Sequence, residues 1–69
     1  MKPGEKWRIK SEDIPAVTPV IIDSVKNDNV YFWHITSDGT YTGTLYSGKR
    51  NPFWRHRVNF LKDYEKVWE

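Results

Sequence analysis

The stretch NVYFWHIT, residues 29–36, carries the clearest structural signal in this sequence. β-Branched and aromatic residues fill it, and these residue types fit the pleated surface of a strand. Successive residues of a strand point to opposite faces of its sheet. The two faces are formed by Val30, Phe32 and His34 and by Tyr31, Trp33 and Ile35. Because both faces are largely apolar, we expect this strand to be central in a sheet or to cover a groove.

Turn signals stand on both sides of this strand. The preceding KNDN, residues 26–29, offers Asn and Asp, which tolerate the left-handed backbone of tight hairpins. The following TSDGT, residues 36–40, contains Asp38-Gly39, which fits a turn that ends in a glycine with positive φ. The sequence therefore predicts strands over 20–26, 29–36 and 40–46.

The flanking segments predict shorter elements. Residues 5–10 alternate as a strand does, whereas two prolines make 11–19 a loop or an edge segment. Gly43 indicates a bulge or a sharp bend. The remaining predictions are a loop over 47–52, a strand over 53–58, a short helix within 59–67 with Asn59 as its N-cap, and a closing strand over 66–69. The expected core is Trp7, Ile9, Val20, Ile22 (or Ile21), Val30, Phe32, Leu45, Phe60, Leu61, Tyr64 and Val67.

Length and composition limit the class of protein. The chain has 69 residues, so we expect one domain over residues 1–69. It has no cysteine, which excludes disulfides and favours a reducing setting. The N-terminus lacks the apolar core of a signal peptide, and the longest apolar run, residues 20–22, is far below the ~20 residues of a membrane span. We therefore expect a cytoplasmic protein with no membrane partner.

The order of these elements resembles that of the SH3-like small barrels over most of the chain. The resemblance is one of layout: short strands, a strong bend, and a helical turn before a last strand. We therefore expect an all-β fold, a small SH3-like barrel of five or six short antiparallel strands with one helical turn near residues 60–64. The chain lacks the late Pro-x-x-Tyr element of the SH3 ligand groove, and an OB-type barrel is the alternative. In size and aromatic density the chain is also similar to small phage-encoded proteins that bind host factors.

Catalytic and metal chemistry have little support in the sequence. A nucleophile–base set can be drawn from His34, Asp23 and Ser24, but no local signature accompanies it. Two separated histidines without cysteine do not make a structural zinc site. The sequence has neither a calcium loop nor a glycine-rich phosphate loop. We therefore expect a protein that is not an enzyme and that uses no metal and no cofactor.

The segment KRNPFWRHRVNFLK, residues 49–62, holds five cations and three aromatic residues but no acid. Cations neutralise phosphates and release counterions, and exposed aromatic rings stack on unpaired bases. The sequence therefore predicts a module that binds nucleic acid, DNA or RNA, through a basic-aromatic surface.

Alternation within 53–58 divides this segment into two faces. We expect Trp54 and Val58 to help form the core, so that Phe53, Arg55 and Arg57 make an outward stripe. The predicted binding residues are Lys49, Arg50, Phe53, Arg55, His56 and Arg57, supported by Arg8, Lys10 and Tyr46.

Two other interpretations of the basic segment stay open. It is a solvated face whose long cationic stems cover apolar surface, or it is a protein interface, because Arg, Trp and Tyr are enriched at hot spots. The second makes the protein an inhibitor or adaptor with a host-protein partner, of the phage or anti-defence type. A homodimer through the same apolar face is a variant of it.

Overall fold

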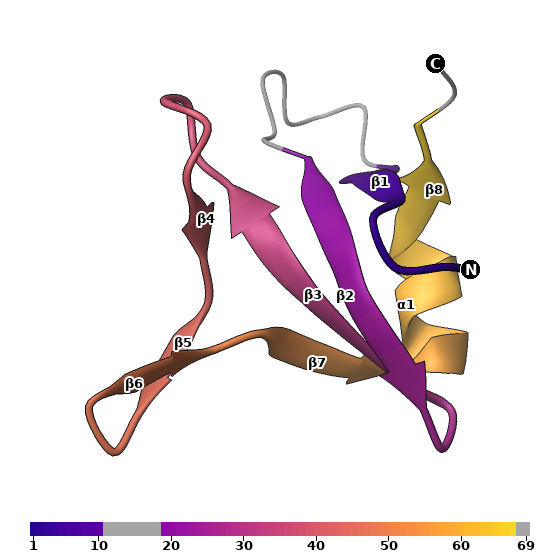
Figure 1. Cartoon of the computed structure of the whole chain (residues 1–69). Coiled ribbons are helices and arrows are strands. Elements are labelled where there is room, and N and C mark those ends of the chain that lie inside the picture. Colours follow the sequence, from indigo (N-terminus) through magenta and orange to yellow (C-terminus); the bar gives the residue numbers. More distant parts are fainter. Residues whose placement is uncertain (11–18, 68–69) are drawn as a thin grey trace.

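The computed structural model describes residues 1–10 and 19–67 and shows an antiparallel all-β fold with one short helix near the C-terminus (Figure 1). The elements are β1 (Lys6–Ile9), β2 (Val20–Lys26), β3 (Asn29–Ile35), β4 (Tyr41–Thr42), β5 (Thr44–Tyr46), β6 (Lys49–Asn51), β7 (Phe53–His56), α1 (Arg57–Asp63) and β8 (Tyr64–Lys66). The predicted fold class is confirmed. The loop predicted over 11–19 lies outside the described residues except for Pro19. Within the described part of the chain, no helix is long and apolar enough to cross a membrane.

Strand β3 is the centre of the sheet, as its two apolar faces predict. It pairs with β2 along one side. Along its other side, the first half pairs with β7 and the second half with β4. The sheet continues from β2 through β1 to β8, while β5 and β6 form a separate hairpin.

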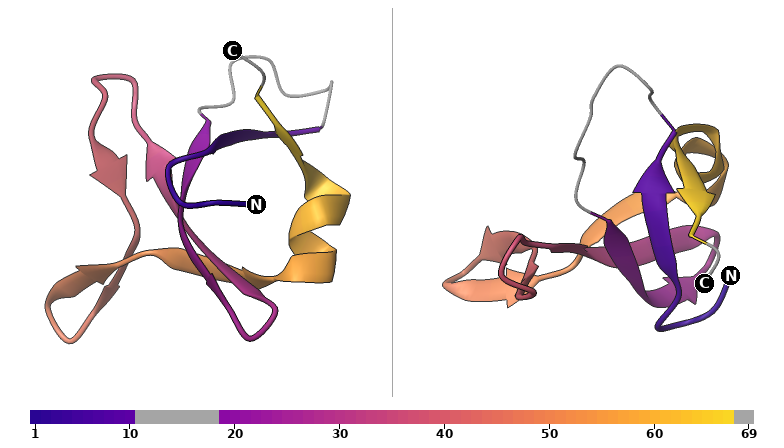
Figure 2. Two further views of the ribbon diagram at one scale, coloured as in Figure 1. Left: turned by 45° about the vertical axis from the view of Figure 1, so that its right-hand side comes forward. Right: turned by 90° about the horizontal axis from the view of Figure 1, so that it is seen from above.

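The sheet does not close into a barrel within the described strands, which corrects one part of the expected architecture. Strands β7 and β8 do not pair with each other. Helix α1 joins them instead, and its residue Phe60 is fully buried in the interior. Figure 2 shows the sheet and α1 curving around a common interior. The layout is therefore barrel-like, with a helix where a barrel would have strand-to-strand hydrogen bonds.

The interior is an aromatic cluster centred on Phe60. Its ring lies 4.6 Å from the ring of Tyr64, 5.3 Å from that of Phe32 and 5.4 Å from that of Trp7. Aromatic pairs at such distances contribute about 0.5–1.5 kcal/mol each beyond their buried area. The buried core consists of Trp7, Val20, Ile22, Val30, Phe32, Phe60 and Tyr64, all of which the sequence predicts.

Leu45 and Leu61 are not core residues as predicted, because the elements that carry them turn them away from the interior. Leu45 is 71% exposed, since Gly43 bends the chain away from β3 and β5 pairs with β6. Leu61 is 40% exposed, because α1 turns only Phe60 toward the interior. The helix begins at Arg57 with His56 as its N-cap, so Asn59 is not the cap.

The two hairpin turns predicted at residues 26–29 and 36–40 form as expected. Asn27 and Asp28 have φ of 50° and 63°, and Gly39 has φ of 88°, as the hairpin signals predict. The carboxylate of Asp38 accepts hydrogen bonds from the hydroxyls of Thr36 and Thr40, which fixes the second turn. The segment 47–52 is not a loop throughout, because Ser47-Gly48 makes the turn and β6 follows it.

Candidate nucleic-acid interface

Strand β7 presents the opposite face from the one expected. In its pairing with β3, Phe53 lies opposite Phe32 and Arg55 lies opposite Val30, so both point to the core side. The Phe53 ring packs 4.8 Å from His34, edge to face. Trp54 points outward and is 63% exposed. The predicted outward stripe of Phe53, Arg55 and Arg57 therefore does not form, and Trp54 and the 62% exposed Val58 are not core residues.

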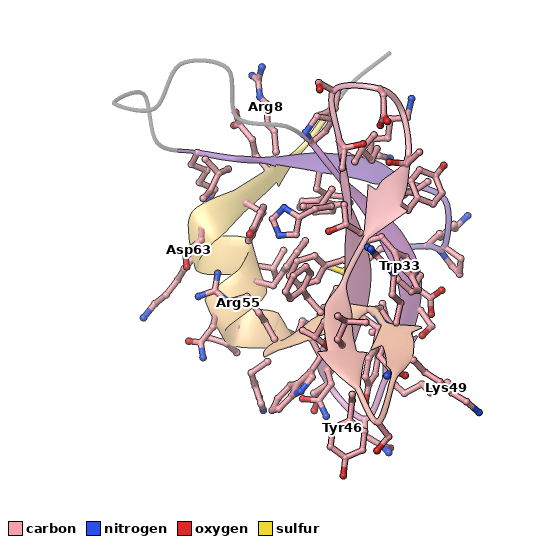
Figure 3. All side chains as sticks on the ribbon, turned by 90° about the vertical axis from the view of Figure 1, so that its left-hand side faces the viewer. Arg8, Trp33, Tyr46, Lys49, Arg55 and Asp63 are labelled. Carbon is pink, nitrogen blue, oxygen red and sulfur yellow. The ribbon has the colours of Figure 1, made fainter. Side chains whose placement is uncertain are left out.

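Arg55 has a structural partner. Its Nη1 lies 2.8 Å from Oδ2 of Asp63, and its guanidinium lies 5.9 Å from the centre of the Tyr64 ring. Burial raises the pKa of the Tyr64 hydroxyl, and the neighbouring Arg55 opposes that rise. Arg55 thus ties β7 to the end of α1, on the side of the molecule away from Trp33 and Lys49 (Figure 3).

Arg8 and Lys10 also act within the fold. Nε of Arg8 donates to Oε1 of Glu65 at 2.8 Å, which joins β1 to β8. Nζ of Lys10 donates to the carbonyl oxygen of Leu61 at 2.9 Å. Figure 3 shows Arg8 at the opposite end of the molecule from Tyr46 and Lys49, so these predicted cations do not form one patch.

The structure shows a groove that the sequence did not predict. It has a volume of about 540 Å³ and lies between the β5–β6 hairpin and the outer face of β2, β3 and β7. Its lining residues are Asp23, Ser24, Lys26, Tyr31, Thr44, Tyr46, Asn51, Pro52 and Trp54. We call this feature the aromatic groove.

Sheet register supplies one wall of the aromatic groove. Ser24 of β2 lies opposite Tyr31 of β3, and Tyr31 lies opposite Trp54 of β7, so the three side chains form a row across the sheet. The hairpin supplies the other wall with Tyr46, which is 76% exposed. The aromatic rings of Tyr31, Trp54 and Tyr46 are therefore gathered in one open groove.

Gly43 allows the hairpin to take this position. A Cβ on Gly43 would lie 2.0 Å from the carbonyl oxygen of Asn51 and 2.9 Å from the ring of Trp33. Only a residue without a side chain fits such a close approach. This glycine and the Ser47-Gly48 turn are the sequence signals from which a folded-back hairpin could have been found.

Three cations lie in or beside the aromatic groove, and a fourth lies on the other face of its hairpin. Lys26 lines the groove, and Lys49 lies opposite Tyr46 on the same face of the hairpin. Arg50 lies on the hairpin's other face, opposite Leu45. The backbone N–H of Arg57 donates to the carbonyl oxygen of Asp28 at 2.7 Å, so Arg57 and its exposed neighbour His56 lie beside the β2–β3 turn. None of the four forms an ion pair within residues 1–10 and 19–67.

Asp23 is the one acid among the residues that line the groove. It sits where β2 bulges, since the register with β3 shifts between Ile22 and Ser24. Nε1 of Trp33 donates a hydrogen bond to Oδ1 of Asp23 at 3.1 Å, and the Ser24 hydroxyl donates one to Oδ2 of Asp23 at 3.2 Å. These two bonds hold the carboxylate in place.

The catalytic set considered from sequence is not assembled. His34 is half-buried on the core side of β3, between Phe32 and Phe53, and burial lowers the pKa of its imidazole. Asp23 and Ser24 lie on the other face, in the groove. Among the residues that the structure describes, no three His, Asp or Glu side chains gather as metal ligands would.

No protein-family model, curated protein or solved structure matches this chain.

Proposed function

We propose that the protein is a non-enzymatic module that binds single-stranded nucleic acid in the aromatic groove. The observation that carries this proposal is the gathering of Tyr31, Tyr46 and Trp54 in one open groove, flanked by cations that form no ion pair with any other described residue. Base–aromatic stacking is worth about 1–3 kcal/mol per base and tolerates every base, since each has a π-face.

The groove favours single strands over duplexes. Bases in a duplex are already stacked and paired, so rings inside a groove are useful only to unpaired bases. The phosphates of a strand lying along the groove would meet cations on both sides, Lys49 from the hairpin and Lys26 and Arg57 from the β2–β3 turn. Of the predicted binding residues, Tyr46, Lys49 and Arg57 fit this arrangement, and His56 adjoins it, whereas Arg50 lies on the other face of the hairpin.

Binding should weaken as salt rises, because each neutralised phosphate releases counterions. With three phosphate contacts on a single strand, the slope of log affinity against log salt should be about −2. We expect this slope in fluorescence anisotropy of a labelled oligonucleotide between about 50 and 200 mM salt. A slope near zero, or no anisotropy change at the lowest salt, contradicts the proposal.

Groove variants locate the binding site. Trp54→Ala combined with Tyr46→Ala should weaken binding at least about tenfold, since two stacking partners are removed. Lys49→Glu should weaken binding and flatten the salt slope. Lys62→Glu is the matched control, because it makes the same charge change on exposed α1 residue Lys62, which does not line the groove. Equal losses in Lys49→Glu and Lys62→Glu would mean that the groove is not the site.

A protein-binding role is the second candidate, that of a small inhibitor or adaptor such as phages encode. The observation that favours it is the exposed apolar surface outside the groove, on Tyr41, Leu45, Val58 and Leu61. Strand β4 ends the described sheet and offers an edge to which a partner's strand can add. Such an interface should show little dependence on salt, which separates it from phosphate binding.

A further inference from the structure

We infer that the aromatic groove prefers guanine to thymine or uracil, and that the Asp23 carboxylate makes this distinction. This inference rests on the proposed function, because it concerns which base the groove accepts. It follows from the one feature of the groove that general attraction to nucleic acid does not explain, an acid among cations and aromatic rings.

A β-bulge and two hydrogen bonds fix the position of the Asp23 side chain. The β-bulge makes Asp23 an extra residue in β2 with no counterpart in β3, which turns its side chain into the groove. The bonds from Trp33 and Ser24 use one acceptor site on each carboxylate oxygen. A carboxylate has about four acceptor sites, so each oxygen keeps one for a ligand.

Charge fixes which part of a strand faces Asp23. A phosphate is repelled by a carboxylate, so the backbone of a bound strand lies toward Lys49 or toward Lys26 and Arg57. The bases then point inward, between Tyr46 and Trp54, and their edges meet Asp23. A residue that accepts hydrogen bonds without donating any selects bases by the donors on those edges.

Guanine is the base whose edge fits best. Its N1–H and N2–H₂ donors lie side by side, so they match the two carboxylate oxygens as a bidentate pair. Lys26 lines the same groove and can donate to guanine O6. Thymine and uracil present one N3–H between two carbonyl oxygens, and those oxygens are repelled by a carboxylate. Cytosine and adenine each offer one amino group and should lie between the two extremes.

The test compares oligothymidines of about twelve nucleotides that differ at one central base. Fluorescence anisotropy with the whole protein should show guanine binding about fivefold or more tighter than thymine, as a good bidentate pair gives. Hypoxanthine, which lacks the N2 amino group, should fall between guanine and thymine. This series needs no variant, so it tests the inference without any risk of misfolding.

Two variants assign the effect to Asp23. Asp23→Asn keeps an acceptor for Trp33 but loses the paired acceptor, so the guanine preference should fall below about twofold. Asp28→Asn is the matched control, because it removes the same charge from the β2–β3 turn at φ of 63°, which Asn tolerates. It should leave the guanine preference unchanged.

The outcomes separate this inference from the proposed function. Equal binding of all the oligonucleotides overturns the guanine preference and leaves single-strand binding in place. The guanine preference is also overturned if Asp23→Asn and Asp28→Asn strengthen the binding of all oligonucleotides alike, since Asp23 would then act only through its charge. If no oligonucleotide binds, the proposed function is overturned and the base preference with it.

Discussion

At the scale of single residues, Arg55 shows how a cation in a basic segment can serve the fold. It reaches Asp63 at 2.8 Å and covers the Tyr64 ring. Both carboxylate and guanidinium are partly exposed, so the pair contributes on the order of 0–1 kcal/mol. Arg57, two residues later, has an exposed side chain with no ion pair in the described ranges. The two arginines should therefore respond differently to the same substitution.

We predict that Arg55→Glu lowers the free energy of unfolding by about 1 kcal/mol, because it places a carboxylate against Asp63. Arg57→Glu should leave stability within about 0.5 kcal/mol of the parent and weaken oligonucleotide binding instead. Urea unfolding followed by tryptophan fluorescence measures the first effect and anisotropy the second. Restored stability in the double variant Arg55→Glu with Asp63→Arg would confirm the ion pair. Equal stability of Arg55→Glu and Arg57→Glu would contradict it.

His34 provides a pH-dependent contribution to stability. Burial between Phe32 and Phe53 lowers the pKa of its imidazole in the folded state below the ordinary value of 6.5. The unfolded chain therefore binds a proton more readily than the folded one, so stability falls as pH drops through the unfolded value. Glu5 and Asp38, whose carboxyl pKa values are lowered to about 2, act only in a more acidic range.

We predict that the free energy of unfolding decreases from about pH 8 to about pH 5 and that His34→Gln removes most of this decrease. Urea titrations at several pH values measure it. His56→Gln is the control, because His56 is exposed on β7. If His34→Gln keeps the full pH dependence, another group is responsible.

At the scale of elements, the sequence predicted those whose signals are local. The turns at 26–29 and 36–40 depend on a few neighbouring residues, and β3 has a strong pattern of its own. The faces of β7 could not be predicted in this way, because both faces carry an aromatic and a basic or titratable side chain: Phe53 with Arg55, and Trp54 with His56. Pairing with β3, a contact between distant segments, decides which face is buried.

The same reasoning explains why the sequence predicted the residues of the candidate groove only in part. Tyr46, Lys49 and Arg50 were predicted from composition near the basic segment; Tyr46 and Lys49 lie on the hairpin face toward the groove, and Arg50 lies on the other face. Asp23 and Tyr31 come from distant strands, and no spacing in the sequence connects them to Tyr46. The groove exists because Gly43 brings β5–β6 back toward the sheet.

The hairpin therefore provides an element-scale prediction. Gly43→Ala places a Cβ 2.0 Å from the Asn51 carbonyl oxygen, so the backbone must shift, at a cost of about 1–3 kcal/mol. We expect the β5–β6 hairpin to move, with oligonucleotide affinity falling at least about fivefold while the core stays folded.

Amide chemical shifts should report the movement of the hairpin and the persistence of Phe60 and Val30 in the core. Gly48→Asn is the control, because its φ of 75° suits Asn and nothing lies within 4 Å of the added Cβ. Shift changes confined to the neighbours of Gly43, with unchanged affinity, would show that the hairpin position is not needed for binding.

At the scale of the whole molecule, helix α1 takes the place of barrel closure. The sheet runs from β4 to β8 without joining its ends, and the chain passes from β7 to β8 through α1. Phe60 of α1 packs against the inner face of the sheet, because its ring lies beside Trp7, Phe32 and Tyr64 from three different strands. A chain of 69 residues buries a small core, so its total stability is of the order of 5 kcal/mol.

We predict that Phe60→Ala removes about 3–5 kcal/mol, which is most of that stability, because the cavity lies where β1, β3 and β8 meet. Thermal unfolding followed by circular dichroism should give a broad, early transition or none. Leu61→Ala in the same helix is the control, since Leu61 is exposed and its loss should cost less than about 1 kcal/mol. If both variants unfold at the same temperature, Phe60 is not the residue that holds α1 against the sheet.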